Sequence, residues 1–185
     1  MFKALMDEGK MSPLRIRFLG GTREVGRSAI SVETEKTRVL LDYGVMLNHE
    51  PGFPMHVPPK EVDAIILGHS HLDHSGAIPI FYIQGRKPVY TNKLTAELSQ
   101  LLISDFIHLS SYYLPYEYLE LRTMMRNIRH LEFGVKETVG DLTFQLFNAG
   151  HIPGSAQVLV EAEGKRLLYT GDFNTIDTRL LRGAM

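Results

Sequence analysis

The stretch His69-Ser70-His71-Leu72-Asp73-His74-Ser75-Gly76 decides what fold and function we expect. Three histidines and an aspartate lie within six positions, directly after the apolar residues 64–67. That apolar run is short, contains two adjacent isoleucines and is bounded by polar residues, as is typical of a buried strand. Because Gly68 lets the chain turn, the four ligand-type side chains are expected to emerge at the carboxyl end of this strand.

The residue types in this stretch are those that bind metal ions. Neutral imidazole nitrogens and an ionised carboxylate suit zinc, manganese or iron, and zinc is the commonest choice for hydrolysis. In an extended segment His69 and His71 point the same way, whereas Asp73 and His74 turn elsewhere. The stretch can therefore serve two neighbouring metal ions. A histidine-rich surface loop is the alternative, and the density of ligands after a buried strand disfavours it.

Composition narrows the class of protein. A chain of 185 residues with 44% hydrophobic and 22% charged residues is typical of one soluble domain. We expect a leader over residues 1–13 and a domain over residues 14–185. The sequence contains no cysteine, no signal sequence and no apolar run that approaches the ~20 residues of a membrane span. These features favour a cytoplasmic protein without a membrane partner. A net charge of -1 gives no overall attraction to nucleic acid.

The apolar pattern predicts an α/β fold, with strands at both ends of the sequence and helices in the middle. Expected strands cover residues 14–19, 29–32 and 39–41 as an antiparallel meander, then 64–67 and 88–90, and finally two hairpins, 136–139 with 142–147 and 156–162 with 166–169. Expected helices cover residues 76–83, residues 93–110 with a wide apolar face, and a segment that begins at Pro115. Residues 45–60 form a long irregular loop.

Ligand-type residues follow four of these expected strands. Asp42, the histidine cluster, His151 and Asp172 each stand where a strand gives way to a turn. Taken alone, each aspartate is better explained as a turn or cap residue. Taken together, four such junctions are expected to converge on one edge of a sheet sandwich and to form one site.

The sequence resembles the metallo-β-lactamase superfamily and, within it, the β-CASP nucleases, in particular archaeal homologues of the cleavage and polyadenylation specificity factor endonuclease. The matching segments are residues 20–26 (GGTREVG), 41–42 (LD), 69–74 (HSHLDH), 150–156 (GHIPGSA) and 169–173 (YTGDF). They run across nearly the whole chain in the order found in the family.

The resemblance implies an αβ/βα sandwich with two zinc ions at the strand ends. It assigns His69, His71 and His151 to one zinc, Asp73 and His74 to the second, and Asp172 to a position bridging the two. Asp42 would lie behind the ligands and orient a ligand histidine. The candidate catalytic residues are thus Asp73, Asp172 and Asp42, although the sequence does not assign proton transfer to any one of them.

The activity implied by the resemblance is zinc-dependent cleavage of single-stranded RNA, of the kind used in mRNA 3′-end processing. β-CASP nucleases carry a second domain and a returning segment, which supplies a last histidine to the second metal, and this sequence contains neither. We therefore expect an incomplete second metal site, impaired activity, an exposed sheet edge, and pairing with the absent portion, with a partner subunit or with another copy.

Two other functions remain open from the sequence. A small-molecule metallohydrolase of the glyoxalase or lactonase type would keep the fold and the metals, and a non-catalytic subunit would bind RNA or a partner. The substrate-binding residues are unknown. The first forty residues contain a group of basic side chains, which could form a face that binds phosphates or could simply keep the surface soluble; the sequence supports both explanations equally. These residues are Arg15, Arg17, Arg23, Arg27, Lys36 and Arg38.

Overall fold

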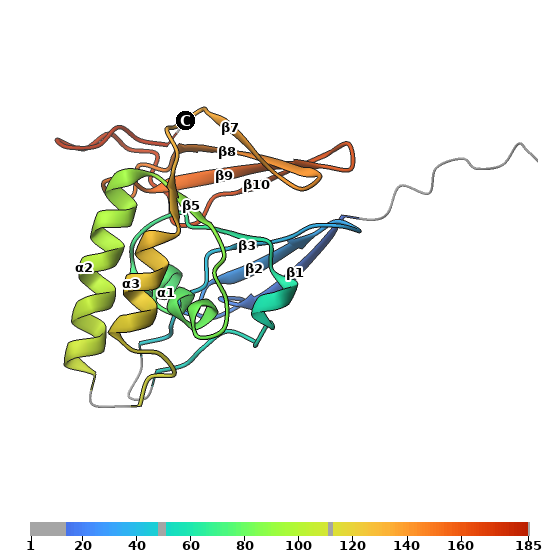
Figure 1. The fold of residues 1–185 in the computed structure, drawn as a ribbon. Helices are drawn as coiled ribbons and strands as arrows, with labels where there is room; N and C mark the ends of the chain where they lie inside the picture. Colours follow the sequence, from blue (N-terminus) through green and yellow to red (C-terminus); the bar gives the residue numbers. More distant parts are fainter. Residues whose placement is uncertain (1–13, 48–50, 111–112, 185) are drawn as a thin grey trace, which may run out of the picture.

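A computed structural model describes residues 14–47, 51–110 and 113–184. The leader expected over residues 1–13 lies outside the described residues. The α/β class is confirmed, because the element order runs from strands through helices and back to strands (Figure 1). Within the described ranges each helix is too short or too polar to span a bilayer.

The first sheet is mixed and contains six strands. In order across the sheet they are β1 (Arg15–Gly20), β2 (Ala29–Glu33), β3 (Arg38–Leu41), β4 (Ala64–Ile66), β5 (Val89–Thr91) and β6 (Ile128–His130). The first three pair antiparallel, which confirms the expected meander, and β3 to β6 pair in parallel. Strand β6 was not expected, because only Ile128 of its three residues is apolar and buried, which is too short a pattern to predict a strand.

The second sheet consists of the two expected hairpins. In order its strands are β10 (Lys165–Tyr169), β9 (Ala156–Ala162), β8 (Leu142–Asn148) and β7 (Lys136–Val139), all antiparallel. Strand β8 alternates buried and partly exposed residues, which is the pattern of a sheet with one covered face.

The helices lie in the middle of the chain. They are the short α1 (Leu72–Ser75), α2 (Lys93–Leu109) and α3 (Tyr118–Arg126), with the 3-10 turns η1 (Pro59–Glu61) and η2 (Ile78–Tyr82). The α-helix expected over residues 76–83 was wrong: this range contains the 3-10 turn η2, and α1 lies just before it, within the histidine stretch. The prediction that Pro115 begins the next helix was wrong, because the side chains and backbone of Glu117 and Glu120 form a capping box that starts α3 at Tyr118.

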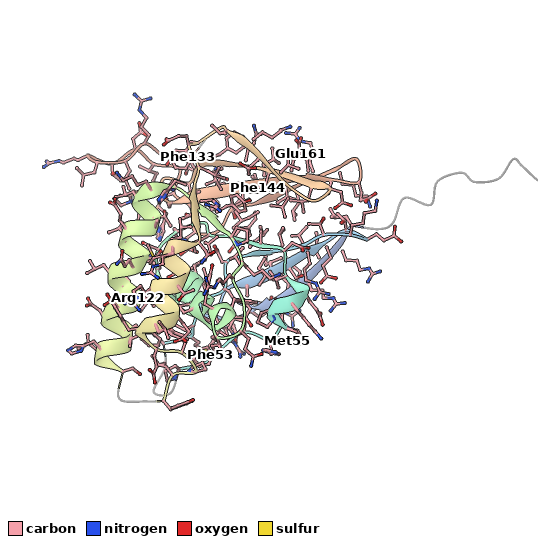
Figure 2. The ribbon with its side chains drawn as sticks, viewed as in Figure 1. Phe53, Met55, Arg122, Phe133, Phe144 and Glu161 are labelled. Carbon is pink, nitrogen blue, oxygen red and sulfur yellow. The ribbon has the colours of Figure 1, made fainter. Side chains whose placement is uncertain are left out.

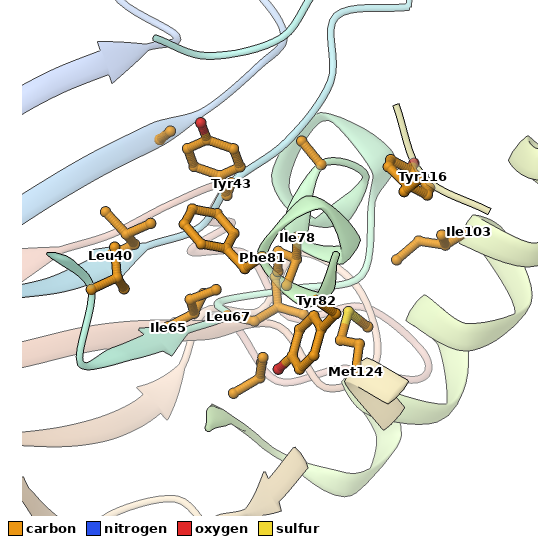
Figure 3. Close-up of a cluster of buried hydrophobic side chains, with 14 of the residues drawn as sticks. Leu40, Tyr43, Ile65, Leu67, Ile78, Phe81, Tyr82, Ile103, Tyr116 and Met124 are labelled. Carbon is orange, nitrogen blue, oxygen red and sulfur yellow. The ribbon is translucent and has the colours of Figure 1, made fainter. Parts of the chain in front are cut away.

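The fold has three layers, which are the helices, the first sheet and the second sheet, and an apolar cluster fills each of the two spaces between them. The helices pack on one face of the first sheet through residues that include Phe81, Ile103 and Met124 (Figure 3). The opposite face packs against the second sheet around Phe144, which is labelled in Figure 2. Among the described residues a helical layer covers only the first sheet, and Leu168 stays exposed on the second.

Part of the expected apolar face of α2 is exposed. Ala96 and Ile103 are buried against the sheet side, whereas Leu94, Leu101 and Leu109 are exposed. The wide apolar face expected on this helix is therefore only partly buried. The reason is geometric, since successive residues advance by about 100° around a helix and these leucines lie on the side away from the core.

Candidate metal centre

The four strand ends singled out in the sequence meet at one place. Asp42 follows β3, the His69–His74 stretch follows β4, His151 lies in the turn between β8 and β9, and Asp172 follows β10. Two of these junctions come from the first sheet and two from the second. The site therefore lies at the edge where the two layers of the sandwich meet.

Backbone hydrogen bonds fix the loop that carries the histidine cluster. The N–H groups of Tyr43 and Val45 donate to the carbonyl oxygens of His74 and Leu72, at 2.8 and 2.9 Å. Gly44 lies between these two donors, where a Cβ would overlap the carbonyl of Asp73. Only glycine allows this close approach, which holds the loop against the end of β3.

Four side chains form the first candidate group. The ligand atoms of His69, His71, His151 and Asp172 all lie within 4.8 Å of one another. His71 Nδ1 and His151 Nε2 are 3.3 Å apart. Burial is the main reason that the pKa of His69 falls to about 3, so its ring is neutral at physiological pH and able to donate a lone pair.

The environment of His69 supplies a test of fit for a metal ion. Its Nε2 atom is buried and has no hydrogen-bond partner within the described part of the chain. Buried polar atoms in native proteins are nearly always paired. A metal ion among these four residues would satisfy this nitrogen, so the donor set fits the metal that the sequence implied.

A second group of ligand-type atoms adjoins the first. His74 Nε2 lies 3.5 Å from Asp172 Oδ1 and 3.8 Å from Asp73 Oδ2. The other oxygen of Asp172, Oδ2, lies 3.6 Å from His151 Nε2. The carboxylate of Asp172 thus stands between the two groups, with one oxygen directed to each.

Asp42 lies behind these residues and is fully buried. Its Oδ1 accepts a hydrogen bond from the Gly68 N–H at 2.7 Å, and its Oδ2 lies 2.7 Å from His74 Nδ1. Asp42, His69 and His74 also come close enough to form a possible metal group. Because both oxygens of Asp42 already have protein partners, we favour the group that contains Asp172.

The backbone of Asp42 is held in an unusual conformation. Its φ of 57° lies in the left-handed region, which non-glycine residues rarely adopt and which costs of order 1–3 kcal/mol. Such strain persists only where the surroundings over-determine the residue, as the partners of its carboxylate do here.

Neighbouring carboxylates determine the charge of His74. Burial alone would lower the pKa of this imidazole, but Asp42, Asp172 and Asp73 outweigh burial and raise it to about 10. In turn, the hydrogen bond from His74 lowers the pKa of Asp172 to about 2. Three carboxylates thus surround one imidazole, and their combined negative charge is an arrangement that attracts a positive ion.

Two residues at the site were not recognised from the sequence. The Tyr169 hydroxyl donates to Asp42 Oδ2 at 2.7 Å, and Ser155 Oγ accepts from the N–H of His151 at 3.0 Å. Burial, reinforced by the Asp42 carboxylate, raises the pKa of Tyr169 well above its usual value, so the hydroxyl keeps its proton. Both residues stood inside motif segments, but nothing in their spacing indicated these partners.

Three of the six basic residues that could form a face for phosphates are paired with glutamates of the protein. Arg17 and Arg38 approach Glu33 at 3.6 and 3.2 Å, and Arg27 pairs with Glu24 at 2.7 Å. These pairs reduce the positive charge that is free for phosphate groups on this side of the molecule.

Comparison with known proteins gives one family and several relatives. The model of the metallo-beta-lactamase superfamily matches residues 22–183. RNase aCSPSF2 of Saccharolobus solfataricus is 38% identical over 91% of this chain, and transcription termination factor FttA of a Lokiarchaeum species is 38% identical over 92%. The chain spans only 35% and 29% of the lengths of these two proteins.

A solved structure supports the fold. The Cronobacter sakazakii metallo-beta-lactamase with a HARLDQ motif aligns with a TM-score of 0.60 and 18% identity, over 92% of this chain and 63% of the other. At this identity the likeness concerns the arrangement of the backbone and carries no information on the substrate.

Proposed function

This chain belongs to the metallo-beta-lactamase superfamily, and from that premise we propose that its site hydrolyses the phosphodiester bonds of single-stranded RNA with the help of bound zinc. The superfamily expected from the motifs is confirmed, and it is a metal-dependent one. The relative named as an RNase supports the nuclease over other chemistries of the superfamily. The observation that carries the proposal is the buried Nε2 of His69, which has no hydrogen-bond partner among the described residues and lies beside three further ligand-type side chains.

We propose the following assignment of ligands. His69, His71 and His151 hold one zinc ion, His74 and Asp73 hold a second, and Asp172 lies between the two. The separate directions of the two Asp172 oxygens support this role. The described residues offer fewer donors to the second ion than to the first, so the second ion is expected to bind more weakly.

Bound zinc would polarise a phosphoryl oxygen and lower the pKa of water at the site toward neutrality. The protein's own carboxylates then have distinct tasks. Asp172 and Asp73 are partly exposed, with side-chain exposures of 47% and 29%, so they can contact substrate and move a proton at a carboxylate oxygen. Asp42 is fully buried and faces His74, so its task is to orient that imidazole.

The proposed domain covers residues 14–185, and the proposed partner is RNA. A small-molecule metallohydrolase would use the same metals. The names of the relatives favour a nucleic-acid substrate instead, because one relative is named an RNase and the other a transcription termination factor. Because the chain spans about a third of these relatives, the activity of the longer proteins comes to this chain only as a proposal.

The test is cleavage of an end-labelled single-stranded RNA by zinc-loaded protein. We expect cleavage that a chelator abolishes, that zinc restores and that Asp172→Asn reduces at least ~10²-fold, as loss of a metal-bridging carboxylate should. His108→Ala on the exposed side of α2 is the matched control and should cleave like the parent protein. Cleavage of a thioester or lactone without cleavage of RNA would favour the small-molecule hydrolase instead.

A further inference from the structure

One hydrogen bond joins the two sheets directly behind the candidate metal centre. Tyr169 is the last residue of β10 in the second sheet, and Asp42 follows β3 of the first. The Tyr169 hydroxyl donates to Asp42 Oδ2 at 2.7 Å. The same oxygen lies 2.7 Å from His74 Nδ1, so two donors from different layers converge on one carboxylate oxygen.

This convergence determines which nitrogen of His74 faces the site. An ionised carboxylate only accepts hydrogen bonds, so His74 Nδ1 must carry the proton that it shares with Asp42. His74 Nε2 is then directed to the side where Asp172 and Asp73 lie. The Gly68 N–H holds the other Asp42 oxygen, which leaves the carboxylate no freedom to rotate.

Tyr169 also controls the position of Asp172. Only two residues separate them along the chain, and β10 ends at Tyr169. A tyrosine tied to Asp42 therefore fixes the start of the Asp172 loop relative to His74. The hydroxyl thus acts on both partners of the 3.5 Å contact between His74 Nε2 and Asp172 Oδ1.

We propose that Tyr169 is a positioning residue of the metal centre, which acts through Asp42 to fix the ring orientation of His74 and the location of Asp172. This inference rests on the proposed metal site for its function, whereas the contact between Tyr169 and Asp42 is itself observed. The proposal assigns a role to Tyr169, a residue of the motif segment 169–173 to which the family resemblance assigned none.

The first test needs no metal and no substrate. In the metal-free parent protein, proton NMR should detect a His74 Nδ1–H signal with a nuclear Overhauser contact to the Tyr169 hydroxyl proton, because both protons lie against one oxygen. Tyr169→Phe should shift this His74 signal or broaden it beyond detection. Tyr82→Phe, which removes a buried hydroxyl bonded to the carbonyl of Lys87, is the matched control and should leave it unchanged.

The second test measures zinc affinity by competition with a chromogenic chelator. Tyr169→Phe should weaken the ion held by His74 by ~10–100-fold, as loss of outer hydrogen-bond partners does, and should affect the His69–His71–His151 ion less. A purely structural role would lower the thermal stability of the metal-free protein while leaving both affinities as they were.

The outcomes separate this inference from the proposed function. A His74 signal that moves in Tyr169→Phe supports the inference even where RNA is not cleaved, whereas cleavage with an unmoved signal overturns the inference and keeps the function. If Tyr169→Phe does not fold, the Overhauser contact in the parent protein decides alone. Its absence overturns the inference.

Discussion

Replacing Asp42 with asparagine tests how the site is held together. The substitution keeps the shape of the side chain but removes its charge and turns one oxygen into an N–H₂ group. Asp42 accepts hydrogen bonds from Gly68 N, His74 Nδ1 and the Tyr169 hydroxyl. In either orientation the amide would set its N–H₂ against at least one N–H donor, so a buried donor loses its partner.

The magnitude follows from these contacts. Loss of a hydrogen bond to a charged group costs about 1.5–3 kcal/mol, and a buried donor left without a partner costs about 1–3 kcal/mol. We therefore expect Asp42→Asn to lower the free energy of unfolding of the metal-free protein by about 3–5 kcal/mol. In a domain of this size each kcal/mol lowers Tm by about 2–4 °C, so Tm should fall by roughly 10 °C.

The assay is thermal unfolding of metal-free protein followed by circular dichroism, together with zinc titration. The same substitution should weaken the His74 ion by ~10–100-fold, because a neutral amide orients the imidazole less firmly than the carboxylate does. Asp105→Asn, on an exposed position of α2, is the matched control and should change stability by less than ~0.5 kcal/mol. An Asp42→Asn protein with parental Tm and parental zinc affinity would refute the reasoning.

Two further predictions concern pH and backbone space. The pKa of His74 is raised to about 10, so its stabilisation of the metal-free protein is complete below pH ~6.5 and is lost as the pH rises toward 10. The pKa of His69 is lowered to about 3, so the stability of the protein also falls as the pH drops from ~6.5 toward 3. Unfolding by urea at successive pH values should give a maximum near pH 6.5, and His74→Ala should flatten the alkaline side; an unchanged alkaline slope would show that another group causes it. Gly44→Ala should destabilise the protein by at least ~3 kcal/mol in the same unfolding assay, because the new Cβ would overlap the Asp73 carbonyl. Gly134→Ala is the control: this residue has a positive φ but lies in open space, so the substitution should cost only ~1 kcal/mol. Equal costs for the two substitutions would contradict the steric argument.

The strands and their ligand-bearing ends could be predicted because they depend on local pattern. The run at residues 64–67 is apolar throughout, as a strand buried on both faces requires, and β4 is indeed fully buried. The hairpins at Gly140 and Gly164 carry turn residues with positive φ between apolar runs. Once strand ends are placed, the convergence of Asp42, His151 and Asp172 follows from sheet geometry.

Other features depended on contacts between distant residues and could not be predicted. Strand β6 pairs with β5, and this pairing, rather than its own polar sequence, makes it a strand. Helix α3 starts at Tyr118 because two glutamates exchange hydrogen bonds with its backbone, whereas a proline signal suggested an earlier start. The Tyr169 contact with Asp42 spans 127 positions of the sequence, so no local pattern could reveal it.

Metal content tests the central claim most directly. Elemental analysis of purified parent protein and of the His69→Ala/His71→Ala double variant would give the zinc bound per chain. The account predicts at least one zinc ion in the parent protein and none in the double variant, because this change removes two of the four side chains that converge within 4.8 Å. A folded double variant that retained stoichiometric zinc would contradict the assignment of the site.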